Sequence, residues 1–95
     1  MRAKFFTIGS FLVRSRNLFV AVGDVTEGEV RPGMNVEVDL GHFRVGATIA
    51  NVEVIEVAFR NQDYLGLAFA FEDPEDLEFW QALRLGEETL ELSVG

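Results

Sequence analysis

The chain has 95 residues, a formal net charge of −8 and no cysteine. The lack of cysteine excludes disulfide bonds, thiolate metal sites and a cysteine nucleophile. Hydrophobic residues make up 48% of the chain and nine residues are phenylalanine, which is the composition of a packed globular domain and not of a disordered tail. A chain of this length is expected to form a single domain that spans residues 1–95.

The charge is unevenly distributed along the chain. Residues 1–48 hold five acids and six bases, whereas residues 49–95 hold eleven acids and two bases. The acidic second half repels phosphate backbones, so the net charge of −8 argues against nucleic acid as a partner. RNA binding would need the basic residues of the first half to gather on one face. These residues are Arg2, Lys4, Arg14, Arg16, Arg31 and Arg44.

The N-terminal segment does not have the pattern of a targeting signal. Its apolar run is interrupted by Thr7, Gly9 and Ser10, which does not fit a signal peptide or a membrane span. We therefore expect a cytoplasmic protein without a membrane partner.

Two apolar segments near the N-terminus predict a β-hairpin. Residues 5–13 and 18–25 are rich in β-branched and aromatic residues, and a polar segment separates them. Both sides of the first segment are apolar. In the second segment the apolar residues move from even to odd positions at Gly23, and we call this a change of parity. It predicts a bulge or a sharp bend of the kind that barrel corners need.

Three glycines at intervals of five residues punctuate the next stretch. We assign structural turn roles to Gly23, Gly28, Pro32 and Gly33. Gly28 can supply a positive φ, and the last two fit a type II turn with Pro second and Gly third. Residues 34–40 then alternate between apolar and polar side chains, which predicts a half-buried strand.

The middle of the chain predicts two further strands. Residues 43–57 are long for one strand, and their apolar parity shifts near Val54 and Ile55, which predicts a second bulge. Residues 64–71 carry large apolar side chains on one parity and small ones on the other. This pattern indicates a strand that is covered on both faces.

A helix is predicted over residues 74–84. Asp73 is expected as the N-cap and Pro74 as the first helical residue, with further acids in the first turn. Gly86 is a candidate C-terminal cap, and residues 89–94 alternate as a closing strand. Apolar residues share one arc of the helix, which we expect to plug an open end of a small β-barrel. These residues are Leu77, Phe79, Trp80 and Leu83.

No residue pattern predicts a catalytic, cofactor-binding or metal site. His42 is the only histidine and follows a glycine in a turn without a nearby nucleophile motif. The acids between residues 72 and 78 lack the alternating ligands and central glycine of a calcium loop. The three spaced glycines lack the Gly-Lys-Ser/Thr ending of a phosphate loop. We therefore expect a protein that is not an enzyme and needs no cofactor.

The high aromatic content leaves two interpretations open. The nine phenylalanines, Trp80 and Tyr64 can all lie inside the barrel or under the helix. Alternatively, some of them form an exposed apolar patch that marks a partner surface or a homodimer contact. The candidate interaction surface consists of Arg14, Arg16, Phe79 and Trp80.

One motif supports a family resemblance. The spacing Gly23-x-Val25-x-x-Gly28-x-Val30-x-x-Gly33-x-x-Val36-x-Val38 resembles the second, β-barrel domain of translational GTPases such as elongation factor Tu. The resemblance implies an all-β fold, a closed Greek-key barrel of about six strands, that offers a contact surface to a GTPase domain, the ribosome or aminoacyl-tRNA. These 95 residues contain no nucleotide-binding domain, so GTP hydrolysis is not implied.

Three functions are compatible with these patterns. The favoured one is a non-catalytic module that binds a protein partner or associates with itself. The second is a ribosome- or RNA-associated accessory protein of translation. The third is a sensor of cyclic dinucleotides, because residues 64–71 and the acidic helix after them also resemble PilZ domains. Those domains use Arg-x-x-x-Arg and Asp-x-Ser-x-x-Gly, which Arg14-x-Arg16 and Asp24-x-Thr26-x-Gly28 do not match.

Overall fold

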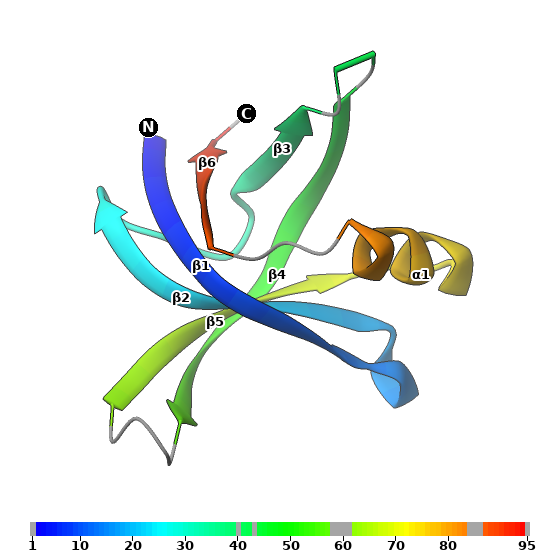
Figure 1. The fold of residues 1–95 in the computed structure, drawn as a ribbon, viewed down its shortest axis with the longest axis horizontal. Helices are drawn as coiled ribbons and strands as arrows, with labels where there is room; N and C mark the ends of the chain where they lie inside the picture. The colour runs from blue at the N-terminus through cyan, green and yellow to red at the C-terminus, as the bar shows by residue number, and fades with distance from the viewer. Residues whose placement is uncertain (1, 40, 43, 58–61, 84–86, 95) are drawn as a thin grey trace.

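The computed structural model describes residues 2–39, 41–42, 44–57, 62–83 and 87–94. The predicted strands and helix are present, with bounds that differ by a few residues. In chain order the elements are β1 (Arg2–Val13), the 3-10 turn η1 (Arg14–Arg16), β2 (Leu18–Glu27), β3 (Asn35–Asp39), β4 (Arg44–Val57), β5 (Gln62–Ala70), α1 (Pro74–Ala82) and β6 (Glu88–Ser93) (Figure 1).

The six strands form a closed, antiparallel barrel. Their order is β1-β2-β5-β4-β3-β6, and β6 pairs with β1 to close the ring. β3, β4 and β5 are consecutive neighbours, whereas β2 lies beside β5 and not beside β3. This arrangement is a Greek key. The expected fold class, a small closed all-β barrel with one short helix, is therefore confirmed.

Large apolar side chains fill the barrel interior. The fully buried ones include Phe5, Phe19, Met34, Val36, Ile49, Leu67, Phe69 and Leu92. Thr7 is buried among them, and its hydroxyl donates a hydrogen bond to the carbonyl of Glu88 at 3.3 Å. This bond adds a polar link between β1 and the closing strand β6, in a chain too short to have a large core.

The bulge predicted at Gly23 of β2 lies in the neighbouring strand instead. Thr7 pairs with Gly23 and Gly9 pairs with Val22, so Ile8 is the extra residue and this bulge belongs to β1. In β2, Ala21 and Val25 pack on the barrel core on both sides of Gly23, so the face of the apolar residues does not change there. The extra residue of β2 is Thr26, because Lys4 pairs with Glu27 and Phe5 with Val25. A Cβ at position 23 would overlap the carbonyl oxygen of Phe6, so the close approach of the two backbones requires glycine.

The bulge predicted near Val54 and Ile55 lies at Ala50 instead. Ala50 is the extra residue in the pairing of β4 with β5, whereas Val54 and Ile55 pair in step with their partners. The predicted position was wrong because both faces of β4 carry apolar side chains. Val52 packs on the barrel core, and Ile55 packs on the outer side of the sheet. The change in parity therefore needs no inserted residue.

The segment between β2 and β3 contains a tight turn at Arg31–Met34. Gly33 has φ +93°, and the Met34 amide donates a hydrogen bond to the Arg31 carbonyl at 3.3 Å. These are the features of a type II turn with Pro32 second and Gly33 third. Gly28, where β2 ends, has φ +74°.

Helix α1 begins at a side-chain cap. The Asp73 carboxylate accepts a hydrogen bond from the Glu75 amide at 2.9 Å, and Pro74 occupies the first turn. This cap satisfies one amide that the helix itself leaves unpaired. The last helical residue is Ala82. Gly86, predicted as the C-terminal cap, lies outside the described residues.

Trp80 anchors α1 on one end of the barrel. Its ring centroid lies 5.8 Å from that of Phe19, 6.2 Å from that of Phe69 and 5.8 Å from that of Phe71. The helix therefore covers the end at which β2 begins and β5 ends (Figure 1). In the part of the chain that the structure describes, no helix has the length and apolar character to cross a membrane.

Candidate interaction surfaces

The structure separates the four residues of the sequence-based interaction surface. Arg14, Arg16 and Phe79 are exposed, whereas Trp80 is only 3% exposed and belongs to the barrel core. The assignment of Trp80 to an exposed surface therefore needs correction. Helical periodicity could not make this distinction, because Phe79 and Trp80 lie on neighbouring parts of one apolar arc.

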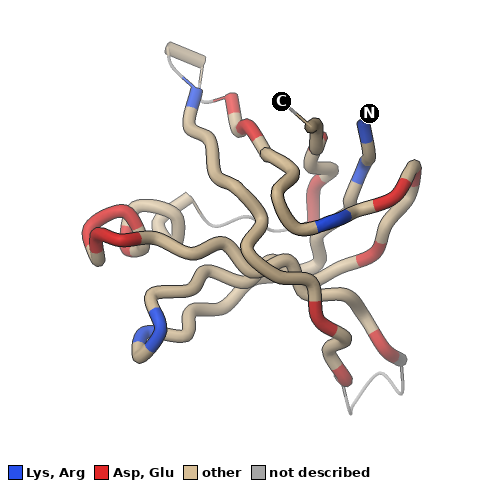
Figure 2. Tube along the Cα trace, turned by 180° about the vertical axis from the view of Figure 1, so that it is seen from behind, with Lys and Arg blue, Asp and Glu red and all other residues tan. Residues whose placement is uncertain are grey.

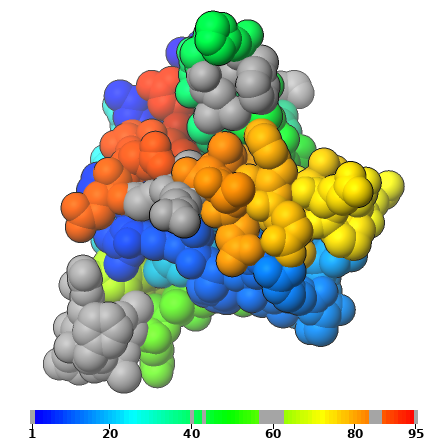
Figure 3. Space-filling view, turned by 45° about the vertical axis from the view of Figure 1, so that its right-hand side comes forward, coloured from blue at the N-terminus to red at the C-terminus, as the bar shows by residue number. Residues whose placement is uncertain are grey.

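Arg14 is engaged within the chain. Its guanidinium forms an ion pair with Glu78 and donates a hydrogen bond to Oε1 of Gln81 at 3.2 Å. This hydrogen-bonded pair lowers the pKa of Glu78 and raises the pKa of Arg14. The contact fastens η1 to the exposed side of α1, and Figure 3 shows the helix lying against this part of the chain. Arg14 thus joins two elements of the fold.

A second apolar cluster lies on the outside of the barrel. We call it the outer cluster. Its residues alternate along β2 and β5 with residues of the barrel interior, such as Phe19 and Ala21 in β2, so they occupy the opposite face of the sheet. The members are the buried residues Val20, Val22, Tyr64 and Ala68 and the partly buried residues Ile8, Val13 and Ile55.

Gly66 lies at the centre of the outer cluster. It pairs with Val22 of β2 on one side and with Glu53 of β4 on the other. A Cβ at this position would lie 2.8 Å from Cγ1 of Ile55 and 3.1 Å from Cγ1 of Val20. The missing side chain therefore lets Ile55 and Val20 approach each other. The cluster is continuous across β1, β2, β5 and β4.

Phe11 extends the outer cluster to the solvent. It pairs with Val20 in the antiparallel ladder between β1 and β2, and paired residues share one face of a sheet. Its side chain is 44% exposed. An exposed aromatic side chain that continues a cluster of apolar residues is typical of a surface that a partner covers.

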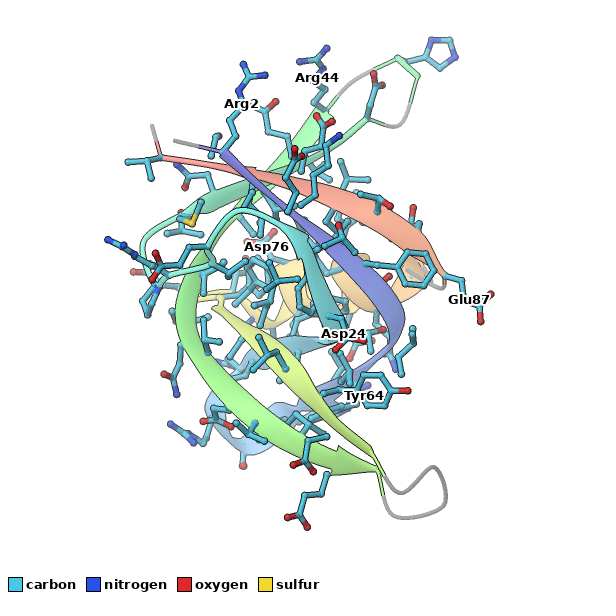
Figure 4. The ribbon with its side chains drawn as sticks, turned by 90° about the vertical axis from the view of Figure 1, so that its left-hand side faces the viewer. Arg2, Asp24, Arg44, Tyr64, Asp76 and Glu87 are labelled. Atoms are coloured by element: carbon cyan, nitrogen blue, oxygen red, sulfur yellow. The ribbon has the colours of Figure 1, made fainter. Side chains whose placement is uncertain are left out.

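Acidic side chains border the outer cluster. Glu53 is exposed on the same face of the sheet because it pairs with Gly66. Asp24 is exposed beside Tyr64, since the preceding residue of β2 pairs with the following residue of β5 (Figure 4). Figure 2 shows further acids where β4 ends and β5 begins. These acids, Glu56 and Asp63, pair next to Ile55 and Tyr64 and so project from the opposite face of the strands. The acidic border of the outer cluster thus consists of Asp24 and Glu53, and the exposed Arg16 lies at the other end of the cluster, beyond Val13.

A polar cleft of about 370 Å³ lies between the outer sides of β3 and β6. Arg44 forms ion pairs in it with Glu37 at 3.5 Å and with Asp39 at 3.9 Å. Arg2 reaches the cleft from the first residue of β1, at the same end of the barrel as Arg44 (Figure 4). The lining residues are Arg2, Glu37, Asp39, Arg44, Glu91, Leu92 and Ser93.

Neither the acids nor His42 form a metal site among the residues that the structure describes. No three side chains of the types His, Cys, Asp or Glu come together in this part of the chain in an arrangement that could hold an ion. His42 is exposed in the turn between β3 and β4. Comparisons of the chain with protein-family models, with curated proteins and with solved structures give no match.

Sequence reasoning missed both the outer cluster and the cleft. The signal for the outer cluster was present, since β1 carries apolar residues on both parities and β5 carries a small residue, Gly66, on its outer parity. The cleft had no local signal. Its residues come from four strands, and only the barrel topology brings them together.

Proposed function

We propose that this chain is a non-catalytic protein-binding barrel that contacts a basic partner protein through the outer cluster and Phe11. The observation that carries the proposal is the position of Phe11, 44% exposed at the edge of a packed apolar cluster outside the barrel. A closed barrel buries its own core on the inner face of its strands. On the outer face, the cluster buries its own central residues, and Phe11 at its edge leaves apolar area that a partner can cover.

The charge of the chain favours a basic partner over a second copy. The net charge is −8, and Asp24 and Glu53 stand on the same face as the outer cluster. Two such surfaces would bring like charges together, which costs free energy and slows association. A surface with lysine or arginine around an apolar centre complements this one.

Site-specific crosslinking tests the proposal. The photoreactive residue p-benzoylphenylalanine replaces Phe11 in one protein and Phe79 in a control, because Phe79 is also aromatic and exposed, at 38%, and belongs to neither apolar cluster. Both proteins are irradiated in a lysate of the cells from which the chain comes. We expect position 11 to give a product with a protein of isoelectric point above about 9, and we expect position 79 not to give this product.

Two outcomes would contradict the proposal. Identical products at both positions would mean that Phe11 marks no specific surface. A covalent dimer of this chain as the main product at position 11 would replace the basic partner with self-association. The resemblance to the second domain of translational GTPases stays a prediction, which a ribosomal protein or a GTPase domain as the crosslinked partner would support.

A further inference from the structure

The pairing between β3 and β6 is the shortest in the barrel. Only Asn35 with Ser93 and Val36 with Leu92 pair across it. β3 nevertheless continues to Asp39 and pairs with β4 over its whole length. In the described ranges, the segment Glu37–Asp39 therefore has a strand neighbour on the β4 side only.

The cleft opens where this pairing stops. Glu37 and Asp39 line it from β3, and Glu91 lines it from β6. The last paired residues, Val36 and Leu92, point into the core and are 0% and 1% exposed, so the barrel interior is sealed below the cleft. An open strand edge beside a cleft offers backbone donors and acceptors to an extended chain.

The charged residues on the open edge of β3 determine which side chains an added strand should carry. Glu37 and Asp39 are two residues apart in β3, so both carboxylates project from the same face of the strand. In a strand added beside β3, every second side chain would lie on the same face as these carboxylates and next to them. Arg44 already forms ion pairs with both carboxylates, so a lysine or arginine of the added strand would share them with Arg44 and would face Glu91 across the cleft. The three acids outnumber the two bases of the lining, Arg2 and Arg44, so the cleft keeps a negative charge that favours a basic strand.

We propose that an extended basic segment of a partner protein binds in this cleft as an added strand on the open edge of β3. The binding combines backbone hydrogen bonds to Glu37–Asp39 with ion pairs to the carboxylates that line the cleft. This site is separate from the outer cluster, and the proposal does not depend on what the outer cluster binds.

Peptide titration into the isotope-labelled full chain, followed by nuclear magnetic resonance, tests the proposal. The probe is a short capped peptide in which lysine and valine alternate. We expect shifts of the Glu37–Asp39 and Glu91 amides, and an affinity that falls about tenfold when glutamate replaces lysine, since like charges then meet. An otherwise identical peptide with methylated backbone nitrogens on one edge should also bind about tenfold more weakly, because it cannot donate those hydrogen bonds.

A matched pair of variants locates the site on the protein. Glu37→Lys and Glu88→Lys change the net charge equally, and both replace exposed strand residues. Glu88 belongs to neither the cleft lining nor the outer cluster. We expect Glu37→Lys to weaken binding of the lysine peptide about tenfold and Glu88→Lys to change it less than about twofold. Equal effects of the two variants would overturn the proposal. Undiminished binding of the methylated peptide would also overturn it, because attraction between charges alone would then explain the binding.

Discussion

The side chain of Ile55 in β4 lies over Gly66 in β5, where a Cβ would come within 2.8 Å of its Cγ1. This contact brings β4 into the apolar layer outside the barrel, together with Val20 of β2 and Tyr64 of β5. The outer cluster therefore depends on a glycine in the middle of a strand, although glycine ordinarily weakens strands. The proposed partner surface is built on this layer.

Replacement of Gly66 by alanine should disturb the outer cluster. The new Cβ would displace Ile55 and Val20, and overpacking of this kind costs about 1–3 kcal/mol. Gly46→Ala is the matched control, since its Cβ would come no closer than 3.4 Å to the Val36 carbonyl oxygen. Urea denaturation of both variants measures the difference. Equal stability of Gly66→Ala and the wild type would show that the cluster is loosely packed.

The neighbouring aromatic residues of α1 should differ strongly in their effect on stability. Trp80→Ala removes a ring that contacts Phe19, Phe69 and Phe71, and loss of a buried aromatic side chain costs about 3–5 kcal/mol. Phe79→Ala should cost less than about 1 kcal/mol because Phe79 is 38% exposed. The free energy of unfolding of each variant in urea gives the comparison. A similar loss for both would contradict the placement of Trp80 in the core.

The ion pair between Arg14 and Glu78 predicts a dependence of stability on pH. Hydrogen bonding to Arg14 lowers the pKa of Glu78 from the ordinary glutamate value of 4.5. A carboxylate whose pKa is lower in the folded state stabilises the fold above its unfolded pKa, and this stability is lost as the pH falls through the folded pKa. Glu78→Gln should therefore lower the melting temperature slightly at pH 7, and the difference should vanish in acid below the folded pKa.

The Arg14→Gln background supplies the control for this pH effect. If Arg14 is the cause, Glu78→Gln should produce no further change in that background at any pH. The difference at pH 7 should also shrink in high salt, since the pair is exposed. An effect of Glu78→Gln on the melting temperature that persists without Arg14 would assign the pH dependence to another contact.

The sequence predicts most of the fold because the relevant signals are local. Alternation of apolar and polar residues identifies the strands, and Asp73 with Pro74 identifies the start of α1 through groups within three residues of each other. Pro32 and Gly33 identify their turn in the same way. Each of these features is decided by backbone preferences that do not depend on the rest of the chain.

The candidate surfaces depend on contacts between distant residues. Apolar residues on both sides of β1 are a signal for a second apolar face, but the sequence does not specify which residues form it. Trp80 enters the core because Phe19 and Phe69, from two other elements, leave a place for its ring. Ile55 lies outside the barrel because Gly66 in the neighbouring strand makes room for it. The apolar residues of both faces of β4 look alike in the sequence, and only the pairing with β5 assigns them to the core or to the outer cluster.

The affinity of the crosslinked partner for two phenylalanine variants tests the central claim most directly. Phe11 and Phe79 have similar exposure, 44% and 38%, and only Phe11 adjoins the outer cluster through its pairing with Val20. We predict that Phe11→Ser weakens binding of that partner at least about tenfold, as for an aromatic residue central to an interface, and that Phe79→Ser changes it less than about twofold. Equal affinities of Phe11→Ser and the wild type would contradict a partner surface on the outer cluster.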